Sequence, residues 1–155
     1  MKTKFTIITL LISFLFSLPI SAQFGFETDG STDAGLVDIS AVSGQTEVSQ
    51  DNEFKAALKV SIAEHWHVNS NKPLQDYLIA AKLFIDEAEP VKITNIYYPK
   101  SHMIPFFDDS LSVFDGDFYI PFTAKLDESY TGSEITLNLQ FEYQPCNDKE
   151  CKAPN

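Results

Sequence analysis

The sequence contains no arginine. Its 11 basic residues are all lysines, and with 22 aspartates and glutamates they give a formal net charge of −11 at pH 7. Phosphate backbones and anionic lipid surfaces are bound by clustered cations, arginine foremost among them. The composition therefore excludes nucleic acid and membrane surfaces as direct ligands. Its acidity favours solubility and is expected to bias the choice of partner surface.

Long apolar runs are absent except at the amino terminus. There, Lys2 and Lys4 precede an apolar stretch over residues 5–18, and small residues lead up to Gln23. The stretch is shorter than the roughly 20 residues of a membrane-spanning helix, and the segment is typical of a secretory signal peptide. We expect cleavage after Ala22, which would deliver the protein to the periplasm or the exterior without inserting it into a membrane.

After this expected signal peptide, residues 1–22, the chain divides into two further parts. Residues 27–35 are small, polar and poor in apolar side chains, which is typical of a flexible arm. We expect this arm to cover residues 23–35. Residues 36–155 show no internal repeat or linker, and their length suits one domain. We expect this domain to be monomeric.

The motifs of several enzyme classes are missing as well. No glycine-rich phosphate loop occurs, and no serine, histidine and aspartate stand in a recognisable motif, so nucleotide-dependent and hydrolytic activities have no support. We expect no cofactor other than a redox-active disulfide.

The three histidines offer only a weak case for a metal site. His65 and His67 would face the same side of a strand, with His102 as a third nitrogen. The simpler interpretation is that they are ordinary surface or packed residues beside a core Trp66. A copper site needs a histidine soon after the cysteine, and none follows Cys146. The two cysteines and two histidines of a zinc site lack a recognisable spacing, so we expect no metal.

Apolar residues alternate with polar ones in several stretches, which is the period-two pattern of strands with one buried face. Residues 101–110 are expected to form a loop, and residues 65–68 to prolong the first strand. We expect the last two alternating stretches to pair with each other, in an all-β sandwich. The clear alternations are 54–62, 118–126 and 135–143, and the apolar runs 78–85 and 91–98 are also strand-like, although 78–85 could be a short helix.

Only two cysteines are present, Cys146 and Cys151, with four residues between them. A disulfide that closes a loop of about six residues stabilises a fold by only about 2 kcal/mol, against about 5 kcal/mol for a loop of about a hundred. A chain of this size can also bury a core without cross-links. From the residues alone, a structural disulfide and a redox-active pair stay open, with a metal site or unrelated thiols as lesser alternatives.

Acidic side chains outnumber lysines around the pair. Because negative charge raises the pKa of a nearby thiol, the reduced pair would be a reluctant nucleophile. It is better suited to being attacked as a disulfide by a partner's thiolate and to passing electrons on after docking. The charged residues are Glu142, Asp148 and Glu150 against Lys149 and Lys152.

Residues 143–154 read Tyr-Gln-Pro-Cys-Asn-Asp-Lys-Glu-Cys-Lys-Ala-Pro. They resemble the Tyr-Gln-x-Cys, short acidic loop, Cys-x-x-Pro signature of the N-terminal periplasmic domain of the thiol:disulfide interchange protein DsbD, also described as a disulfide-bond corrector domain. Two weaker likenesses lie upstream, at residues 64–69, where the family has a Gly/Trp/Tyr-rich strand, and at residues 104–108, where it has a short aromatic loop.

The resemblance implies an immunoglobulin-like antiparallel β-sandwich that exchanges disulfides in the exported compartment, in processes that include cytochrome complex assembly. The pair would accept electrons from a membrane thiol-electron transporter or a thioredoxin-like donor and pass them to oxidised periplasmic proteins. By the same resemblance, Cys151 would form the mixed disulfide and Cys146 would resolve it. The competing hypothesis is a secreted binding or structural domain with an inert disulfide.

The resemblance also implies a cap over the disulfide, formed by Phe106 and Phe107, which moves aside when a partner docks. Trp66, His65 and His67 would line the disulfide pocket. Equally, the two phenylalanines could simply plug the end of the sandwich. No acidic residue directly precedes them in this sequence, so no acid–base role is expected at that position.

The family implies a returning strand and further domains after the cysteine segment, whereas this sequence ends at Asn155. We expect either a stand-alone module or a piece of a longer protein that lacks this strand. Without the returning strand, we expect the cysteine loop to be weakly anchored.

Overall fold

The computed structural model describes residues 35–45, 47–49, 52–132 and 135–155. The expected signal peptide and nearly all of the expected arm lie outside the described residues. Within the described part, every regular element is a β-strand and none is a helix, which confirms the all-β prediction. No helix in that part is long and apolar enough to cross a membrane.

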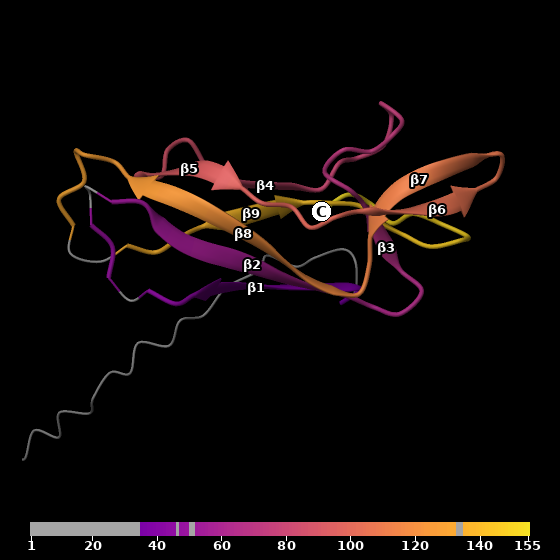
Figure 1. Ribbon diagram of the computed structural model, residues 1–155, viewed down its shortest axis with the longest axis horizontal. Helices are drawn as coiled ribbons and strands as arrows, with labels where there is room; N and C mark the ends of the chain where they lie inside the picture. Colours follow the sequence, from indigo (N-terminus) through magenta and orange to yellow (C-terminus); the bar gives the residue numbers. More distant parts are fainter. Residues whose placement is uncertain (1–34, 46, 50–51, 133–134) are drawn as a thin grey trace, which may run out of the picture.

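One layer of the molecule is a four-stranded antiparallel sheet in the order β1-β2-β8-β5 (Figure 1). Its central strands are those whose sequence alternates most regularly, because each presents one apolar face to the interior. The bounds are β1 Val37–Ser43, β2 Phe54–Ile62, β8 Asp117–Leu126 and β5 Val91–Ile96.

The other layer is divided into two antiparallel sheets, one in the order β10-β3-β7-β6 and one that pairs β4 with β9. The chain passes from β9 through Tyr143 and Gln144 directly into β10, so the two sheets share one continuous segment. The bounds are β3 His67–Asn69, β4 Lys82–Ile85, β6 His102–Phe106, β7 Asp109–Phe114, β9 Leu139–Glu142 and β10 Pro145–Cys146.

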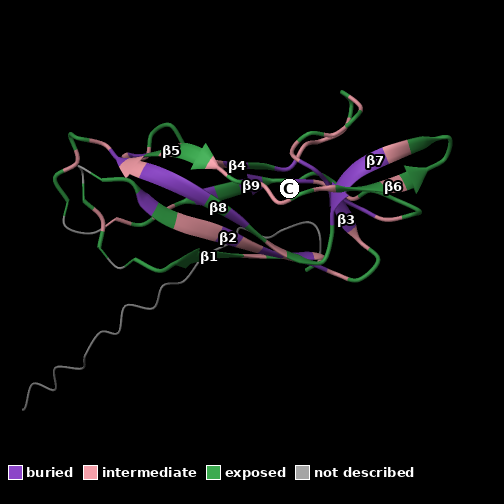
Figure 2. Cartoon of the chain, viewed as in Figure 1, coloured by how far each residue is buried: buried purple, intermediate pink, exposed green. Residues whose placement is uncertain are grey.

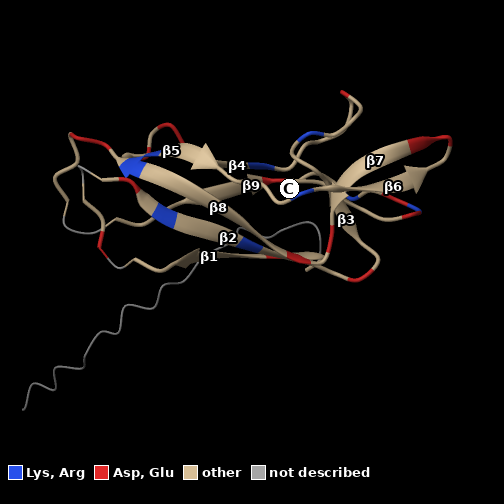
Figure 3. Cartoon of the chain, in the orientation of Figure 1, with Lys and Arg blue, Asp and Glu red and all other residues tan. Residues whose placement is uncertain are grey.

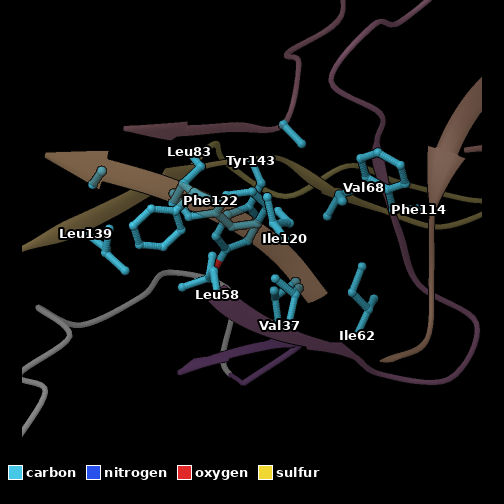
Figure 4. Close-up of a cluster of buried hydrophobic side chains, with 14 of the residues drawn as sticks. Val37, Leu58, Ile62, Val68, Leu83, Phe114, Ile120, Phe122, Leu139 and Tyr143 are labelled. Carbon is cyan, nitrogen blue, oxygen red and sulfur yellow. The ribbon is translucent and has the colours of Figure 1, made fainter. Parts of the chain in front are cut away.

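The core lies between the layers. Side chains from β2 and β8 meet those of β3, β4 and β9 there, and Figure 4 shows Leu58, Phe122, Leu83 and Tyr143 gathered in this cluster. Figure 2 shows the same division along the chain, with buried residues in β8 and exposed residues at the tip of the β6–β7 hairpin. The core draws on strands from both ends of the sequence, so the fold has no need of a covalent cross-link to bring them together.

The predicted pairing of 118–126 with 135–143 is wrong. β8 pairs with β2 and β5 in the first layer, whereas β9 pairs with β4 in the second. Both stretches do alternate in burial, as predicted. Alternation fixes which side chains face the core, but it carries no information about which strand lies alongside.

Three further predictions need correction. Residues 101–110 are not a loop: β6 and the start of β7 pair there, with Phe106 opposite Asp109. Residues 65–68 do not prolong β2, because the chain turns at His65, which has a φ of 67°, and enters the other sheet. Only the second half of 78–85 is a strand, and none of it is helical. The sequence analysis also missed β1 and the rest of β7.

The core predicts a sharp contrast between two aromatic residues of β8. Phe122 is 1% exposed, whereas Tyr119 is 53% exposed on the same strand. Phe122→Ala should lower the free energy of unfolding by about 3–5 kcal/mol, because it leaves a cavity between the layers. Tyr119→Ala, the matched control, should change it by less than about 1 kcal/mol. Urea unfolding of both variants checks this, and equal losses would contradict the assigned core.

Candidate functional site: the Cys146–Cys151 disulfide

Cys146 and Cys151 form a disulfide with four residues between them. The first cysteine sits on β10, which adds to the edge of β3 with Pro145 opposite Val68 and Cys146 opposite His67. In Figure 1 the yellow loop that carries the pair lies at the same end of the molecule as β3 and the β6–β7 hairpin. The disulfide is therefore built on the edge of a sheet, at one end of the sandwich.

The loop between the cysteines is closed by Asn147. Its side-chain oxygen accepts hydrogen bonds from the backbone N–H groups of Lys149 and Glu150, at 2.8 and 2.9 Å. Its own N–H donates to the carbonyl of Glu150 at 2.9 Å. Asparagine commonly closes turns in this way, and the result is a tight loop that brings Cys151 back beside Cys146.

The chain after Cys151 returns alongside the segment that precedes it. The Lys152 N–H donates to the Pro145 carbonyl at 2.8 Å, and the Gln144 side chain donates to the Lys152 carbonyl at 3.0 Å. Asn155 and Tyr143 exchange two backbone hydrogen bonds, at 2.9 and 3.3 Å. The expectation of a weakly anchored cysteine loop is therefore wrong, because residues 152–155 themselves supply the return.

The two cysteines differ in exposure. Cys146 is only 5% exposed, because β10 packs it against the sheet, whereas Cys151 lies on the exposed side of the loop. An attacking thiolate must approach the sulfur of a disulfide directly. Of the two cysteines, Cys151 is the residue that is open to solvent.

A pocket of about 640 Å³ opens beside the loop. It unites the upstream segments that resemble the family, since 64–67 line one part of it and Ile104 and Pro105 of β6 another. Asp148 of the cysteine loop also contributes to the lining. Three stretches far apart in the sequence therefore meet next to the disulfide.

Trp66 is half-buried against the core and also faces the cysteine segment. The ammonium group of Lys152 lies 5.6 Å from the centre of its ring and 2.7 Å from a carboxylate oxygen of Glu150. Lys152 thus contacts both the aromatic face of Trp66 and the carboxylate of Glu150, which limits the positive charge that it presents to the disulfide.

His67 is buried on β3, at 8% exposure. Burial lowers the pKa of its imidazole below the usual value, while the carboxylates of Asp148 and Asp115 act in the opposite direction and His102 adds to the lowering. The Nε2 atom has no hydrogen-bond partner among the described residues. A neutral imidazole is therefore held next to the strand that carries Cys146.

His65 does not join His67 on one strand face. It lies in the turn before β3 with its side chain in solvent, 3.6 Å from Glu64, while His102 lies 3.3 Å from Asp115. In the described ranges, no group of three or more His, Cys, Asp or Glu side chains could hold a metal ion. The same-face geometry that suggested a metal site is thus wrong, although His65 does line the pocket with Trp66 and His67.

Phe106 and Phe107 stand at the tip of the β6–β7 hairpin. Phe107 is 94% exposed, and its ring meets that of Phe106 edge-on with centroids 4.8 Å apart. Its φ of 52° is one that two-residue hairpins usually give to glycine. An exposed aromatic side chain on a strained turn covers nothing in this conformation, so the cap role of the two rings stays a prediction.

The sequence of residues 36–155 matches the protein-family model of the N-terminal domain of the thiol:disulfide interchange protein DsbD. The chain belongs to this DsbD N-terminal family. The family is one of thiol–disulfide interchange domains, and the disulfide described above is this chain's cysteine pair.

A solved structure supports the fold. The crystal structure of the N-terminal periplasmic domain of ScsB from Proteus mirabilis is similar to this chain, with a TM-score of 0.51 and 16% sequence identity. The likeness covers 77% of this chain and 43% of that one, so this chain spans less than half of its length. It confirms the predicted immunoglobulin-like sandwich. No curated protein matches the sequence.

Several residues that shape this DsbD-type site were not predicted as part of it. Asn147 closes the loop, and Asp115 lies in the turn between β7 and β8, where it lines the pocket. An Asn-Asp pair and an Asp-Gly pair are both turn signals in a sequence. These pairs could have predicted the positions of the two turns in the sequence. They could not have predicted that both turns line one pocket, because that depends on the pairing of distant strands.

The unequal burial predicts unequal reactivity after reduction. Iodoacetamide should alkylate Cys151 at least about tenfold faster than Cys146 in the folded, reduced protein, because thiol reactivity follows exposure. Peptide mass mapping at short reaction times measures both rates. In denaturant the two rates should become similar, and faster labelling of Cys146 in the folded protein would contradict the assigned geometry.

Proposed function

We propose that this domain is an exported thiol–disulfide exchange module that works through Cys146 and Cys151. The observation that carries the proposal is the contrast between an exposed Cys151 and a Cys146 that is 5% exposed. This contrast assigns the two sulfurs different roles, as exchange through a mixed disulfide requires. Membership of the DsbD N-terminal family supports the reaction class.

Reduction of the domain begins with the attack of a donor's thiolate on the sulfur of Cys151. The bond between Cys151 and Cys146 breaks, Cys146 leaves as a thiolate, and the donor is joined to Cys151. A second donor thiolate then attacks the donor's own sulfur and releases Cys151 as a thiolate. Two electrons have moved from the donor dithiol to the domain, and the donor is left with a disulfide.

Donation to a client runs in the opposite sense. The Cys151 thiolate attacks a client disulfide and expels one client thiolate, and Cys146 then attacks Cys151 to restore the intramolecular disulfide. The second client thiolate is released, so the client is reduced by two electrons. The buried cysteine thus resolves the complex, and the exposed one meets the partners.

The partners that fit this chemistry are thioredoxin-like proteins and a membrane thiol-electron transporter. The outcome would be the reduction of periplasmic thiol proteins, including those of cytochrome complex assembly. A periplasmic setting agrees with the family and with a signal peptide cleaved after Ala22. Residues 23–35 would then link the cleavage site to the domain.

The β6–β7 hairpin supports a docking or cap role for Phe106 and Phe107. A strained backbone conformation that is kept at a bulky residue often marks a functional site, and both rings are exposed. The hairpin also supplies Ile104 and Pro105 to the pocket beside the cysteine loop. Movement of this hairpin would open or close access to the disulfide. Figure 3 shows acidic residues at its tip, which would favour partners with a basic rim.

The inert-disulfide alternative is less well supported. A cross-link over so short a loop contributes only about 2 kcal/mol, and the core already joins strands from both layers. A structural bridge would also gain nothing from leaving one of its two cysteines exposed.

Mixed-disulfide trapping tests the proposal. Cys146→Ser protein, activated at Cys151 with thionitrobenzoate, should react rapidly with a reduced thioredoxin-like protein that lacks its second cysteine. The product is a covalent adduct visible on a non-reducing gel. Cys151→Ser protein activated at Cys146 is the matched control, and it should react at least about tenfold more slowly because its sulfur is buried.

Failure of the Cys151 form to give an adduct, or equal rates for the two forms, would overturn the assigned roles. Peptide mapping of the adduct identifies the cysteine involved, so a reaction elsewhere would not be mistaken for support.

A further inference from the structure

His67 and Cys146 are cross-strand neighbours. They stand opposite each other in the antiparallel pairing of β3 with β10, and side chains of such a pair lie on the same face with their Cβ atoms about 4.5–5.5 Å apart. Both residues are buried. The imidazole is therefore the side chain that the backbone register places beside the sulfur of the buried cysteine.

The Nε2 atom of His67 is buried without a hydrogen-bond partner in the described part of the chain. Leaving a buried polar atom unpaired destabilises a folded protein, and such atoms call for an explanation. An apolar or aromatic residue would fill this position at no such cost. The oxidised protein thus holds a nitrogen that has no role while the disulfide is closed.

We propose that His67 accepts the proton of the Cys146 thiol in the reduced protein and so generates the thiolate that resolves mixed disulfides. The inference rests on the proposed exchange function and assigns a residue to the step that resolves the mixed disulfide. Cys146 needs such a base, because burial disfavours a thiolate and raises the pKa of a thiol.

The Cys146 proton moves to the neutral imidazole, which becomes an imidazolium. The Cys146 thiolate then attacks the sulfur of Cys151 in the mixed disulfide, a new bond forms between the two cysteines, and the bond from Cys151 to the client breaks. The client departs as a thiolate, and the imidazolium gives up its proton to this thiolate or to solvent, which returns His67 to its neutral state.

The charges around His67 suit both of its states. Burial lowers the pKa of the imidazole, which keeps it neutral and able to accept a proton near pH 7. Asp148 on the cysteine loop and Asp115 in the β7–β8 turn favour the imidazolium once it forms. His102 on β6 opposes it but is itself paired with Asp115, and Glu64 and His65 line the same pocket farther out in solvent. Lys152 is turned to Trp66 and Glu150.

Release of thionitrobenzoate isolates the proposed step. When the reduced protein meets Ellman's reagent, Cys151 attacks first and releases one thionitrobenzoate, and Cys146 then resolves the mixed disulfide and releases a second. His67→Gln should slow the second phase at least about tenfold at pH 7, since a positioned base contributes about 10²–10⁴-fold. The first phase should keep its rate.

The pH profile supplies a readout that loose packing alone would not change. In the wild-type protein the second phase should speed up as the pH rises through an inflection below 6.5, because only the neutral imidazole accepts a proton. His67→Gln should lose this inflection. His102→Gln, a matched substitution on β6, should keep an inflection, moved to higher pH because His102 contributes to the lowered pKa of His67, and it should keep the rate of the first phase. His67→Phe keeps the bulk of a ring and should behave like His67→Gln. This second variant serves as the test if His67→Gln fails to fold.

An unchanged second phase in both His67 variants, or equal slowing of both phases, would overturn the inference. The reaction uses a small reagent and needs no protein partner. A failure of the thioredoxin-like adduct described above would therefore refute the proposed function without affecting this result, and the reverse also holds.

Discussion

The pairing of β10 with β3 is the contact on which the site depends. It places Cys146 opposite His67 at the edge of a sheet and leaves Cys151 on the outer side of the loop. β3 is held from its other side by β7, with Val68 opposite Phe114 and a buried hydrogen bond of 2.8 Å between the hydroxyl groups of Ser70 and Ser112. A short strand of three residues therefore gives the disulfide a rigid base.

Stability and reactivity are separated in this architecture. The core joins both layers through residues such as Phe122 and Leu83, and the disulfide closes only a short loop at one end. Opening that bond removes little of the cross-linking that holds the fold, while the hydrogen bonds of Asn147 and Lys152 keep the loop in place. A module that alternates between oxidised and reduced forms needs this independence.

Part of this picture could be predicted from the sequence. The alternation in β2, β8 and β9 identified their buried faces, and the short spacing of Cys146 and Cys151 suited the disulfide that they form, because both signals are local. Strand pairing was not predictable, since β8 and β9 alternate in the same way yet lie in different sheets. β6 was missed because its residues are mostly exposed and include Pro105, which is uncommon within sheets. The position of His67 beside Cys146 depends on the register of distant strands, which no local pattern records.

The reduction potential of the Cys146–Cys151 disulfide tests the central claim most directly. It can be measured by equilibrating the protein in glutathione buffers and counting alkylated cysteines by mass. An exchangeable disulfide predicts a value above about −300 mV, within the range of proteins that trade electrons with thioredoxin-like partners. A value below about −300 mV is that of a structural bridge, and it would contradict a role in exchange.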